Sequence, residues 1–402
     1  MMLKILMLGT YPIKNQLHGG QIRVSEILKK YKHHGIDARF IAIYNNNSDD
    51  YNHSNKEDIG IYIPPGLIKN HYISDFIIGQ QVANDKSLFS KLTATIVEMR
   101  PDFIQLEQPW LFPYYQKLCN LYPEIKLIYS SQNIEYKLKK NILKLAGYSS
   151  AIYSSVCSEI KKLEKDVCKN ASLVIAVTDK EADELKKFGA SNVIIASNAS
   201  SIKETPNKKI IHYWENKLNQ ERFGLYVGSA HPPNTHGFMK LLGPALGFLA
   251  PNQQIILAGG VGSSICNYDH GIFKLLNWSR LNNLGVISNK DLATVIQMSS
   301  VLLLPIIEKG GSNIKTAEAI LSGKLVIATS TAFRGYEEYK NDRYVTIADN
   351  PDDFKEAIKK CLRKNFNISS DRSDDKYKKL LWNNALEIIP KTLLQITGAQ
   401  KK

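Results

Sequence analysis

The sequence predicts an α/β protein built from two doubly wound parallel sheets. Short apolar runs alternate with longer amphipathic segments along the chain, which is the pattern of parallel strands joined by helices. This alternation occurs in two series, one on each side of a polar segment that contains Pro206 and several lysines. In both series a glycine-bearing loop follows the first apolar run. Ligands of doubly wound sheets bind at the carboxyl ends of the strands, so these loops are the first places to examine for a site.

The first series contains six expected strands. We place them at Lys4–Leu8, Ala38–Tyr44, Phe103–Leu106, Lys126–Ser130, Leu173–Val177 and Val193–Ala196. Apolar residues at helical spacing predict the helices between them. These cover Ile22–Tyr31, Leu88–Met99, Tyr114–Leu121, Ile134–Lys169 and Asp179–Phe188.

The second series repeats the pattern. Strands are expected at Leu225–Val227, Gln254–Ala258, Val301–Leu304 and Leu325–Ala328. Helices are expected at Gly237–Phe248, Asp291–Met298, Ile314–Leu321, Asp352–Leu362 and Lys376–Ile389. We therefore expect a first domain over residues 1–201, a linker over 202–222, a second domain over 223–370, and a last helix with a basic tail over 371–402.

Composition excludes several classes of protein. Of the 402 residues, 44% are apolar and 22% charged, which is ordinary globular usage. No apolar stretch reaches the roughly 18 residues of a spanning helix, and the first apolar run is too short for a signal peptide, so we expect a cytoplasmic protein. The five cysteines are odd in number and lack CxxC spacing, which argues against a disulfide framework or a zinc site.

The charge balance is strongly basic. The chain carries 52 basic and 38 acidic residues, a net charge of +14. Such a balance favours an anionic partner, which could be nucleic acid, an acidic membrane surface or a phosphorylated ligand. No nucleic-acid-binding motif supports the first of these, so we expect no nucleic-acid partner.

The first candidate loop contains Gly19 and Gly20, between the first strand and the first helix. Two glycines allow a ligand to approach the backbone, and the free N–H groups of the helix start can bind an anion. The alternative is an ordinary glycine turn. The chain has neither a GxGxxG nor a GxxxxGK[ST] motif, which disfavours a dinucleotide cofactor and excludes a P-loop.

The second candidate loop occupies the same position in the second series. It runs from Gly228 to Asn234, and Ser229, His231 and Asn234 can donate hydrogen bonds to phosphate oxygens. The alternative is a rigid proline turn with Asn234 as a capping residue.

The third candidate is the most informative. The strand ending at Pro305 leads through a glycine loop containing Gly311, Ser312 and Asn313 into a helix that begins at Ile314. Lys315 and Glu318 are three residues apart and share a helix face. A cation and free N–H groups at a helix start suit a diphosphate, and a carboxylate one turn later suits ribose hydroxyls. The alternative is a surface ion pair.

Together these loops resemble the retaining glycosyltransferases of the GT-B fold, in the large family numbered four (glycosyl transferases group 1). Three elements carry the resemblance, in the family's order and over nearly the whole chain. Ser130–Tyr136 is similar to the family's (H/Q)N-x-E element, Val227–Asn234 to its VGS…PN element, and Gly310–Gly323 to its donor-binding EA-x-x-x-G element. The chain departs from the family at Gly310, where many members carry a glutamate eight residues before the one matched by Glu318.

The resemblance implies two Rossmann-like domains that face a central cleft, with the last helix returning to the first domain. It implies metal-independent transfer of a sugar (a hexosyltransferase-type reaction, with retention) from a nucleotide diphosphate sugar to an acceptor hydroxyl. Lys315 and N–H groups, including that of Gly20, would neutralise the diphosphate, and Glu318 would bind the ribose. The nucleotide sugar is a co-substrate, and no metal or other cofactor is expected.

The resemblance places the acceptor on the first domain. Glu107, at the end of a buried strand, would bind an acceptor hydroxyl or act only as a capping carboxylate. Gln132 and Asn133 would position the reacting sugars. The expected acceptor is a glycan or a lipid-linked sugar in bacterial surface polysaccharide biosynthesis.

The segment Tyr136–Lys144 bears on the location of the protein. Lys137, Lys140 and Lys144 lie towards one side of a helix with apolar residues on the other, which suits peripheral contact with the inner face of an anionic membrane. The alternative is a helix that packs on its own domain and exposes its lysines.

Two other functions remain open. One is a non-catalytic partner subunit that keeps the fold without turnover, and the other is a nucleotide-sugar epimerase of the same fold.

Overall fold

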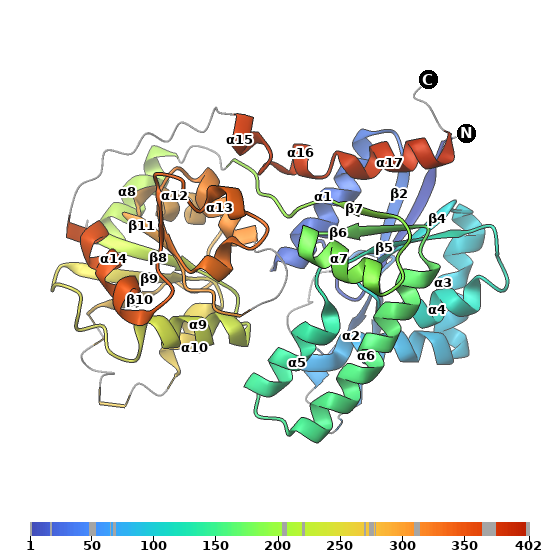
Figure 1. Ribbon diagram of the computed structural model, residues 1–402, viewed down its shortest axis with the longest axis horizontal. Coiled ribbons are helices and arrows are strands. Elements are labelled where there is room, and N and C mark those ends of the chain that lie inside the picture. The colour runs from blue at the N-terminus through green and yellow to red at the C-terminus, as the bar shows by residue number, and fades with distance from the viewer. Residues whose placement is uncertain are drawn as a thin grey trace. The chain divides into compact units, whose positions relative to one another are not determined.

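The structure is a computed structural model. It describes residues 2–16, 18–47, 54–64, 66, 70–202, 207–218, 222–268, 271–272, 277, 279–308, 314–363 and 375–398. The chain divides into two compact units. Unit 1 contains Met1–Ser197 and Asn383–Lys402, and unit 2 contains Asn198–Trp382. Both are parallel sheets covered by helices (Figure 1), which confirms the predicted α/β class with two doubly wound sheets.

Unit 1 contains a seven-stranded parallel sheet in the order β3-β2-β1-β4-β5-β6-β7. Its strands are β1 (Lys4–Gly9), β2 (Asp37–Asn45), β3 (Ile59–Ile61), β4 (Phe103–Glu107), β5 (Lys126–Ser130), β6 (Leu173–Ala176) and β7 (Val193–Ile195). The strand order reverses between β1 and β4. The loops that follow these two strands diverge there, which leaves room for a ligand at the carboxyl edge.

Eight helices are described in unit 1. They are α1 (Gly19–His33), α2 (Asn70–Asn84), α3 (Lys86–Met99), α4 (Phe112–Leu118), α5 (Glu135–Leu145), α6 (Ser150–Asn170), α7 (Asp179–Lys187) and α17 (Ile388–Thr397). The single helix expected over Ile134–Lys169 is two helices. The break follows α5, where Gly147 adopts a φ of 82°, a left-handed conformation that ends a helix.

Unit 2 contains a six-stranded parallel sheet in the order β10-β9-β8-β11-β12-β13. Its strands are β8 (Arg222–Val227), β9 (Gln253–Ala258), β10 (Leu281–Asn283), β11 (Val301–Leu304), β12 (Leu325–Ala328) and β13 (Val345–Ile347). The order reverses between β8 and β11, so the loops after these two strands flank the second switch point.

The described helices of the remaining chain are mostly short. They are α8 (Lys208–Lys217), α9 (Pro232–Leu242), α10 (Val261–Cys266), α12 (Asn289–Met298), α13 (Ile314–Leu321), α14 (Pro351–Arg363), α15 (Asp375–Lys378) and α16 (Trp382–Ala385), with 3-10 turns η2 (Ser330–Phe333) and η3 (Glu337–Tyr339). None of the helices in the described part of the chain is both long and apolar enough to cross a bilayer.

Three further segments that the sequence analysis assigned differ from the structure. The segment expected as a linker contains α8, and Trp214 of α8 is buried in the core of unit 2. The helix expected over Gly237–Phe248 is α9, which starts at Pro232 and ends before Gly243, at a φ of 72°. The helix expected over Lys376–Ile389 is replaced by the separate helices α15, α16 and α17.

Candidate functional site

Gly20 lies in a crowded part of the carboxyl edge of unit 1. It is the second residue of α1, after Gly19, and a Cβ atom at residue 20 would lie 2.7 Å from Gln132 Oε1 and 2.8 Å from the Tyr11 hydroxyl. Only glycine fits between these groups without a shift. Gln132 Nε2 also donates to the Tyr11 hydroxyl at 2.6 Å. The first glycine loop and the predicted Gln132 therefore belong to one packed cluster.

Glu107 lies behind Gln132. Its side chain is 1% exposed, and its carboxylate accepts hydrogen bonds from Gln105 Nε2 and, at 3.4 Å, from Gln132 Nε2. Burial raises the pKa of Glu107, while these hydrogen bonds oppose the shift. Glu107 is therefore buried behind Gln132 and hydrogen-bonded to it.

A second polar cluster surrounds Asn133, and its other members were not among the candidates from sequence. Glu135 Oε1 accepts from Gln108 Nε2 at 3.1 Å and from Asn133 Nδ2 at 3.5 Å. Glu135 Oε2 and Gln108 Oε1 are buried without a hydrogen-bond partner. Burial raises the pKa of Glu135 to about 7. Gln108 adopts a φ of 74°, which a non-glycine residue rarely does and which is common at functional sites.

A partly buried ion pair borders this cluster. Lys139 Nζ lies 3.0 Å from Asp75 Oδ2, and Asp75 Oδ1 accepts from the Thr10 hydroxyl at 2.9 Å. Lys139 Nζ also lies 5.3 Å from the ring centre of Trp110. Helices α2 and α5 thus bring opposite charges to the ends of β1 and β4. The spacing of residues 75 and 139 in the sequence gives no sign of this pairing.

Glu164 of α6 fixes the start of α5. Its carboxylate accepts the backbone N–H groups of Glu135 at 2.7 Å and Tyr136 at 3.0 Å. These are N–H groups that a helix start leaves unpaired, so Glu164 acts as a cap supplied by another helix. Burial raises the pKa of Glu164 to about 8.

In unit 2, three predicted donor-binding residues meet at the carboxyl edge of the sheet. Lys315 Nζ from α13 donates to Asn234 Oδ1 of α9 at 2.9 Å. Asn234 Nδ2 donates to the Ser229 carbonyl at 2.9 Å and lies 3.3 Å from Ser229 Oγ. The loop after β8 and two helix starts therefore converge on one ammonium group.

The backbone allows Lys315 to reach this position. A Cβ atom at Gly228 would lie 3.2 Å from Lys315 Nζ, and the ammonium group lies 5.5 Å from the ring centre of Tyr226. Burial lowers the pKa of Lys315 to about 8, and the carboxylate of Glu318 partly opposes this shift. The ammonium group is therefore poorly solvated, so an anion that pairs with it gains more than it would at an exposed lysine.

The other candidates of this loop are placed as follows. His231 is the N-cap residue of α9, Ile314 is the first residue of α13, and Glu318 is half-buried one turn after Lys315. Gly311, Ser312 and Asn313 lie outside the described residues.

Glu308 has a partner that the sequence does not indicate. Its Oε1 lies 3.1 Å from Nδ1 of His236 on α9. Next to His236, Gly237 packs directly against the end of β11, because a Cβ there would lie 2.0 Å from the Pro305 carbonyl oxygen. Among the described residues, no cluster of three or more histidine, cysteine or acidic side chains could hold a metal ion.

Comparisons with known proteins agree with this architecture. Residues 224–364 match the family model for glycosyl transferases group 1. No match is found among curated protein sequences. The sucrose-phosphate synthase of Thermosynechococcus elongatus superposes with a TM-score of 0.71 at 14% identity, over 99% of this chain and 100% of that one.

Two further solved structures are similar. Anabaena Alr3699/HepE in complex with UDP has a TM-score of 0.61 at 15% identity, and WaaG, a glycosyltransferase involved in lipopolysaccharide biosynthesis, has a TM-score of 0.59 at 15% identity. Each match covers 99% of this chain and 100% of the other. The chain therefore has the two-domain GT-B fold, and its residues 224–364 match the glycosyltransferase group 1 family.

Proposed function

We propose that this protein transfers a sugar from a nucleotide diphosphate sugar to an acceptor hydroxyl. The observation that carries the proposal is the Lys315 ammonium group, held by Asn234 beside Ser229 at the carboxyl edge of the sheet. These residues all lie in the region that matches the glycosyltransferase model. A partly buried cation beside two helix starts is suited to the charge that develops on a leaving diphosphate.

The remaining roles follow from this placement. Glu318, one turn along α13, binds the ribose hydroxyls. Gln132 and Asn133 position the sugars at unit 1, and Glu107 holds Gln132 through the hydrogen bond described above. We propose retention because the motifs resemble those of the retaining GT-B family, and no metal because positioned N–H groups and Lys315 supply the neutralising charge.

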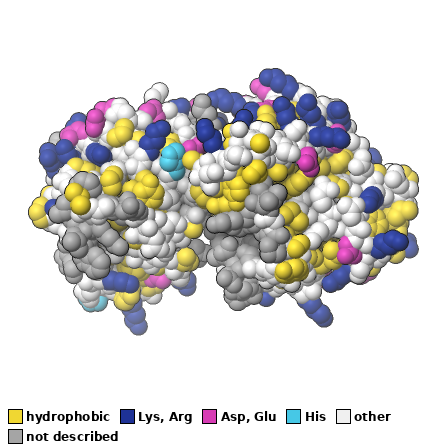
Figure 2. Space-filling model, turned by 90° about the horizontal axis from the view of Figure 1, so that it is seen from below, with side chains coloured by type: hydrophobic (Ala, Val, Ile, Leu, Met, Phe, Trp, Pro, Cys, Tyr) yellow, Lys and Arg dark blue, Asp and Glu magenta, His cyan; other side chains and the backbone are white. Residues whose placement is uncertain are grey.

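We propose an acceptor in bacterial surface glycan assembly, by analogy with WaaG, which is involved in lipopolysaccharide biosynthesis. Basic side chains outnumber acidic ones in the sequence, and many lie on the face drawn in Figure 2. On α5, Lys140 and Lys144 are exposed beside Leu145, whereas Lys137 pairs with Glu184 and Ile142 is buried. Contact with an anionic membrane would therefore use the end of α5.

A thermal-shift panel of UDP, GDP, ADP, CMP and their sugar conjugates tests the donor. A ligand at 100 times its Kd stabilises a protein by about 2.7 kcal/mol, which raises the midpoint by about 5–10 °C for domains of this size. We expect one nucleotide class to give such a shift. No shift with any nucleotide, from a folded sample, would overturn the proposal in favour of a non-catalytic partner subunit.

A further inference from the structure

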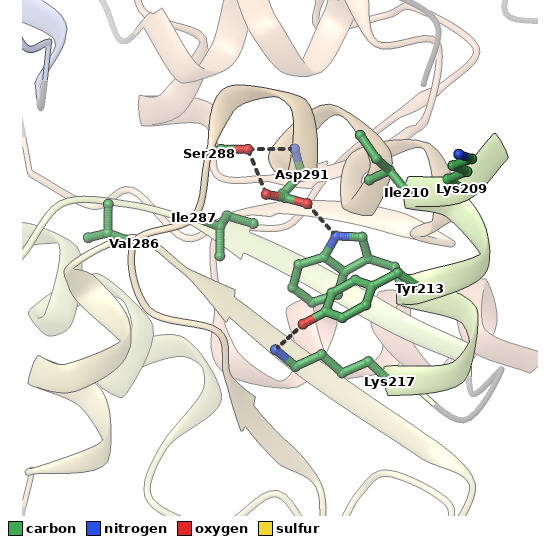
Figure 3. A pocket seen from close by; sticks show the side chains of 9 residues that line it. Lys209, Ile210, Tyr213, Lys217, Val286, Ile287, Ser288 and Asp291 are labelled. Atoms are coloured by element: carbon green, nitrogen blue, oxygen red, sulfur yellow. Dashed lines mark hydrogen bonds between the residues drawn. The ribbon is translucent and has the colours of Figure 1, made fainter. Parts of the chain in front are cut away.

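A groove lies in unit 2 apart from Lys315 and its neighbours. It has a volume of about 560 Å³ and runs between α8 and the segment that leads into α12 (Figure 3). This volume is within the range of small-ligand sites. None of the residues proposed to bind the donor lines the groove.

One wall of the groove is aromatic and rigid. Trp214 is buried, and its Nε1 donates to Asp291 Oδ1 at 2.9 Å, which fixes the ring. Tyr213 packs edge-on against Trp214 and is 54% exposed, and Val286 on the opposite side is 75% exposed. Facing apolar groups of this kind, left open to water, are typical of a surface that receives a ligand.

The cations of the groove are arranged in a row. Lys209, Tyr213 and Lys217 follow one another at i, i+4 and i+8, so they form one stripe along α8. At 1.5 Å per residue, the two lysines are separated by about 12 Å along the helix. The stripe therefore places an aromatic ring between two positive charges.

Neither ammonium group is in an ion pair with a carboxylate of the described residues. Lys217 Nζ donates to the Tyr213 hydroxyl at 3.4 Å and lies 4.7 Å from the Trp214 ring centre, so it is held beside the aromatic wall with no carboxylate to neutralise its charge. The carboxylate in the lining, that of Asp291, is instead engaged by Trp214 and by the Ser288 hydroxyl at 2.6 Å.

We propose that this groove binds an acidic oligosaccharide. A sugar ring would place its apolar face on Tyr213, and carboxylate or phosphate groups on either side would pair with Lys209 and Lys217. A mononucleotide carries its charge on one side of its base only, and a lipid surface is too flat to fill a groove. The choice of a saccharide rests on the proposed function. The groove would hold the acceptor glycan outside the reaction site.

Direct binding to the full-length protein tests this proposal. Isothermal titration and saturation-transfer NMR would use a hyaluronan hexasaccharide, with maltohexaose as the neutral probe. We expect the acidic probe to bind and the neutral probe to bind at least several-fold more weakly. Tyr213→Ala should lower the affinity by about tenfold, and Lys209→Gln with Lys217→Gln should remove most of its salt dependence.

Matched variants serve as controls. Tyr62→Ala removes a tyrosine that is 61% exposed in unit 1, and Lys240→Gln with Lys360→Gln removes two exposed lysines outside the groove. Neither control should change glycan binding, and all variants should keep the wild-type thermal shift with the donor nucleotide. Equal binding of both probes, no binding of the acidic probe, or binding that Tyr213→Ala leaves unchanged would overturn the inference. So would Tyr213-dependent binding of anionic vesicles or of a nucleotide in place of the glycan. If no nucleotide raises the melting midpoint of the wild-type protein, that result would instead contradict the proposed function.

Discussion

At the scale of single residues, Lys315 is the group on which the proposed chemistry depends most. Its contact with Asn234 is a neutral-to-charged hydrogen bond that orients the ammonium group beside Ser229. A bond to a charged group is worth about 1.5–3 kcal/mol, which corresponds to roughly a tenfold to hundredfold change in affinity. Lys315 lies in the first turn of α13 and is only partly buried, so we expect unit 2 to keep its fold when this residue is replaced.

We predict that Lys315→Met lowers the affinity for the donor nucleotide at least about tenfold at pH 7. The wild-type affinity should also fall as the pH rises from 7 to 9, because the pKa of Lys315 is about 8 and the ammonium form is lost above it. A terminal phosphate with a second pKa near 6 is about nine-tenths or more ionised throughout this range, so its own titration changes the affinity little. Titration calorimetry at three pH values measures both effects. A pH dependence that persists in Lys315→Met would show that another group carries it.

Gly20 offers a second residue-scale prediction. Gly20→Ala would place a Cβ 2.7 Å from Gln132 Oε1 and 2.8 Å from the Tyr11 hydroxyl, so the Gln132 side chain must move. We expect turnover to fall by at least about tenfold, because small displacements of positioning groups are costly. Gly60→Ala, where the nearest atoms lie at 3.3 Å, is the matched control in unit 1. Equal turnover of the two variants would contradict the role of Gln132.

The residues of the two sites differ in how far sequence could predict them. Ser229, Asn234 and Lys315 follow strands or begin helices, so their convergence at one sheet edge follows from parallel topology. Gln108 and Glu135 could not be placed in this way. The left-handed backbone of Gln108 and the burial of Glu135 arise from the packing of α2, α5 and α6, which no local pattern shows.

At the scale of elements, close packing of helices on the sheet positions the site in unit 2. α9 carries Asn234 and lies against the end of β11 because Gly237 has no side chain there. Gly237→Ala would create a 2.0 Å contact with the Pro305 carbonyl oxygen, which only a shift of the whole helix can relieve.

We therefore predict that Gly237→Ala destabilises unit 2 by about 1–3 kcal/mol and lowers its melting temperature by about 3–10 °C. The shift of α9 would also weaken nucleotide binding through Asn234. Gly247→Ala, where a Cβ meets nothing within 4 Å, should melt like the wild type. Differential scanning calorimetry measures the melting temperatures of the two variants and the wild type. If the melting temperature of Gly237→Ala equals that of the wild type, α9 shifts without any loss of stability in unit 2, and the prediction is wrong.

Sequence patterns predicted elements better when they were apolar than when they were short or polar. Every strand expected at an apolar run is present, whereas three of the four three-residue strands, β3, β10 and β13, were not expected because so few residues carry little pattern. α8 was missed because its lysines and asparagine resemble a linker. Its Trp214 contact with Asp291 is tertiary and has no local signature.

At the scale of the whole molecule, the two sheets follow from the repeated strand–helix pattern, but the chain returns to unit 1 at its end. α17 packs along β7, with Ile389, Pro390 and Leu393 buried. At the start of α17, Glu387 lies 2.7 Å from Lys30 and 3.2 Å from His34, both in or next to α1. Unit 1 is therefore completed by residues that follow all of unit 2 in the sequence.

Deleting residues 387–402 tests this dependence. Each buried apolar side chain contributes about 1.5–3 kcal/mol, so we predict a marked loss of stability that is confined to unit 1. Hydrogen exchange should become faster in β7 and α1, where contacts are lost, and remain unchanged in β8, β9 and β11. The donor nucleotide should still protect α13, because Lys315 and Asn234 lie in the other unit. Faster exchange throughout unit 2 would show instead that α17 stabilises the molecule as a single cooperative body, and the assignment of the two sites to separately folding units would then be wrong.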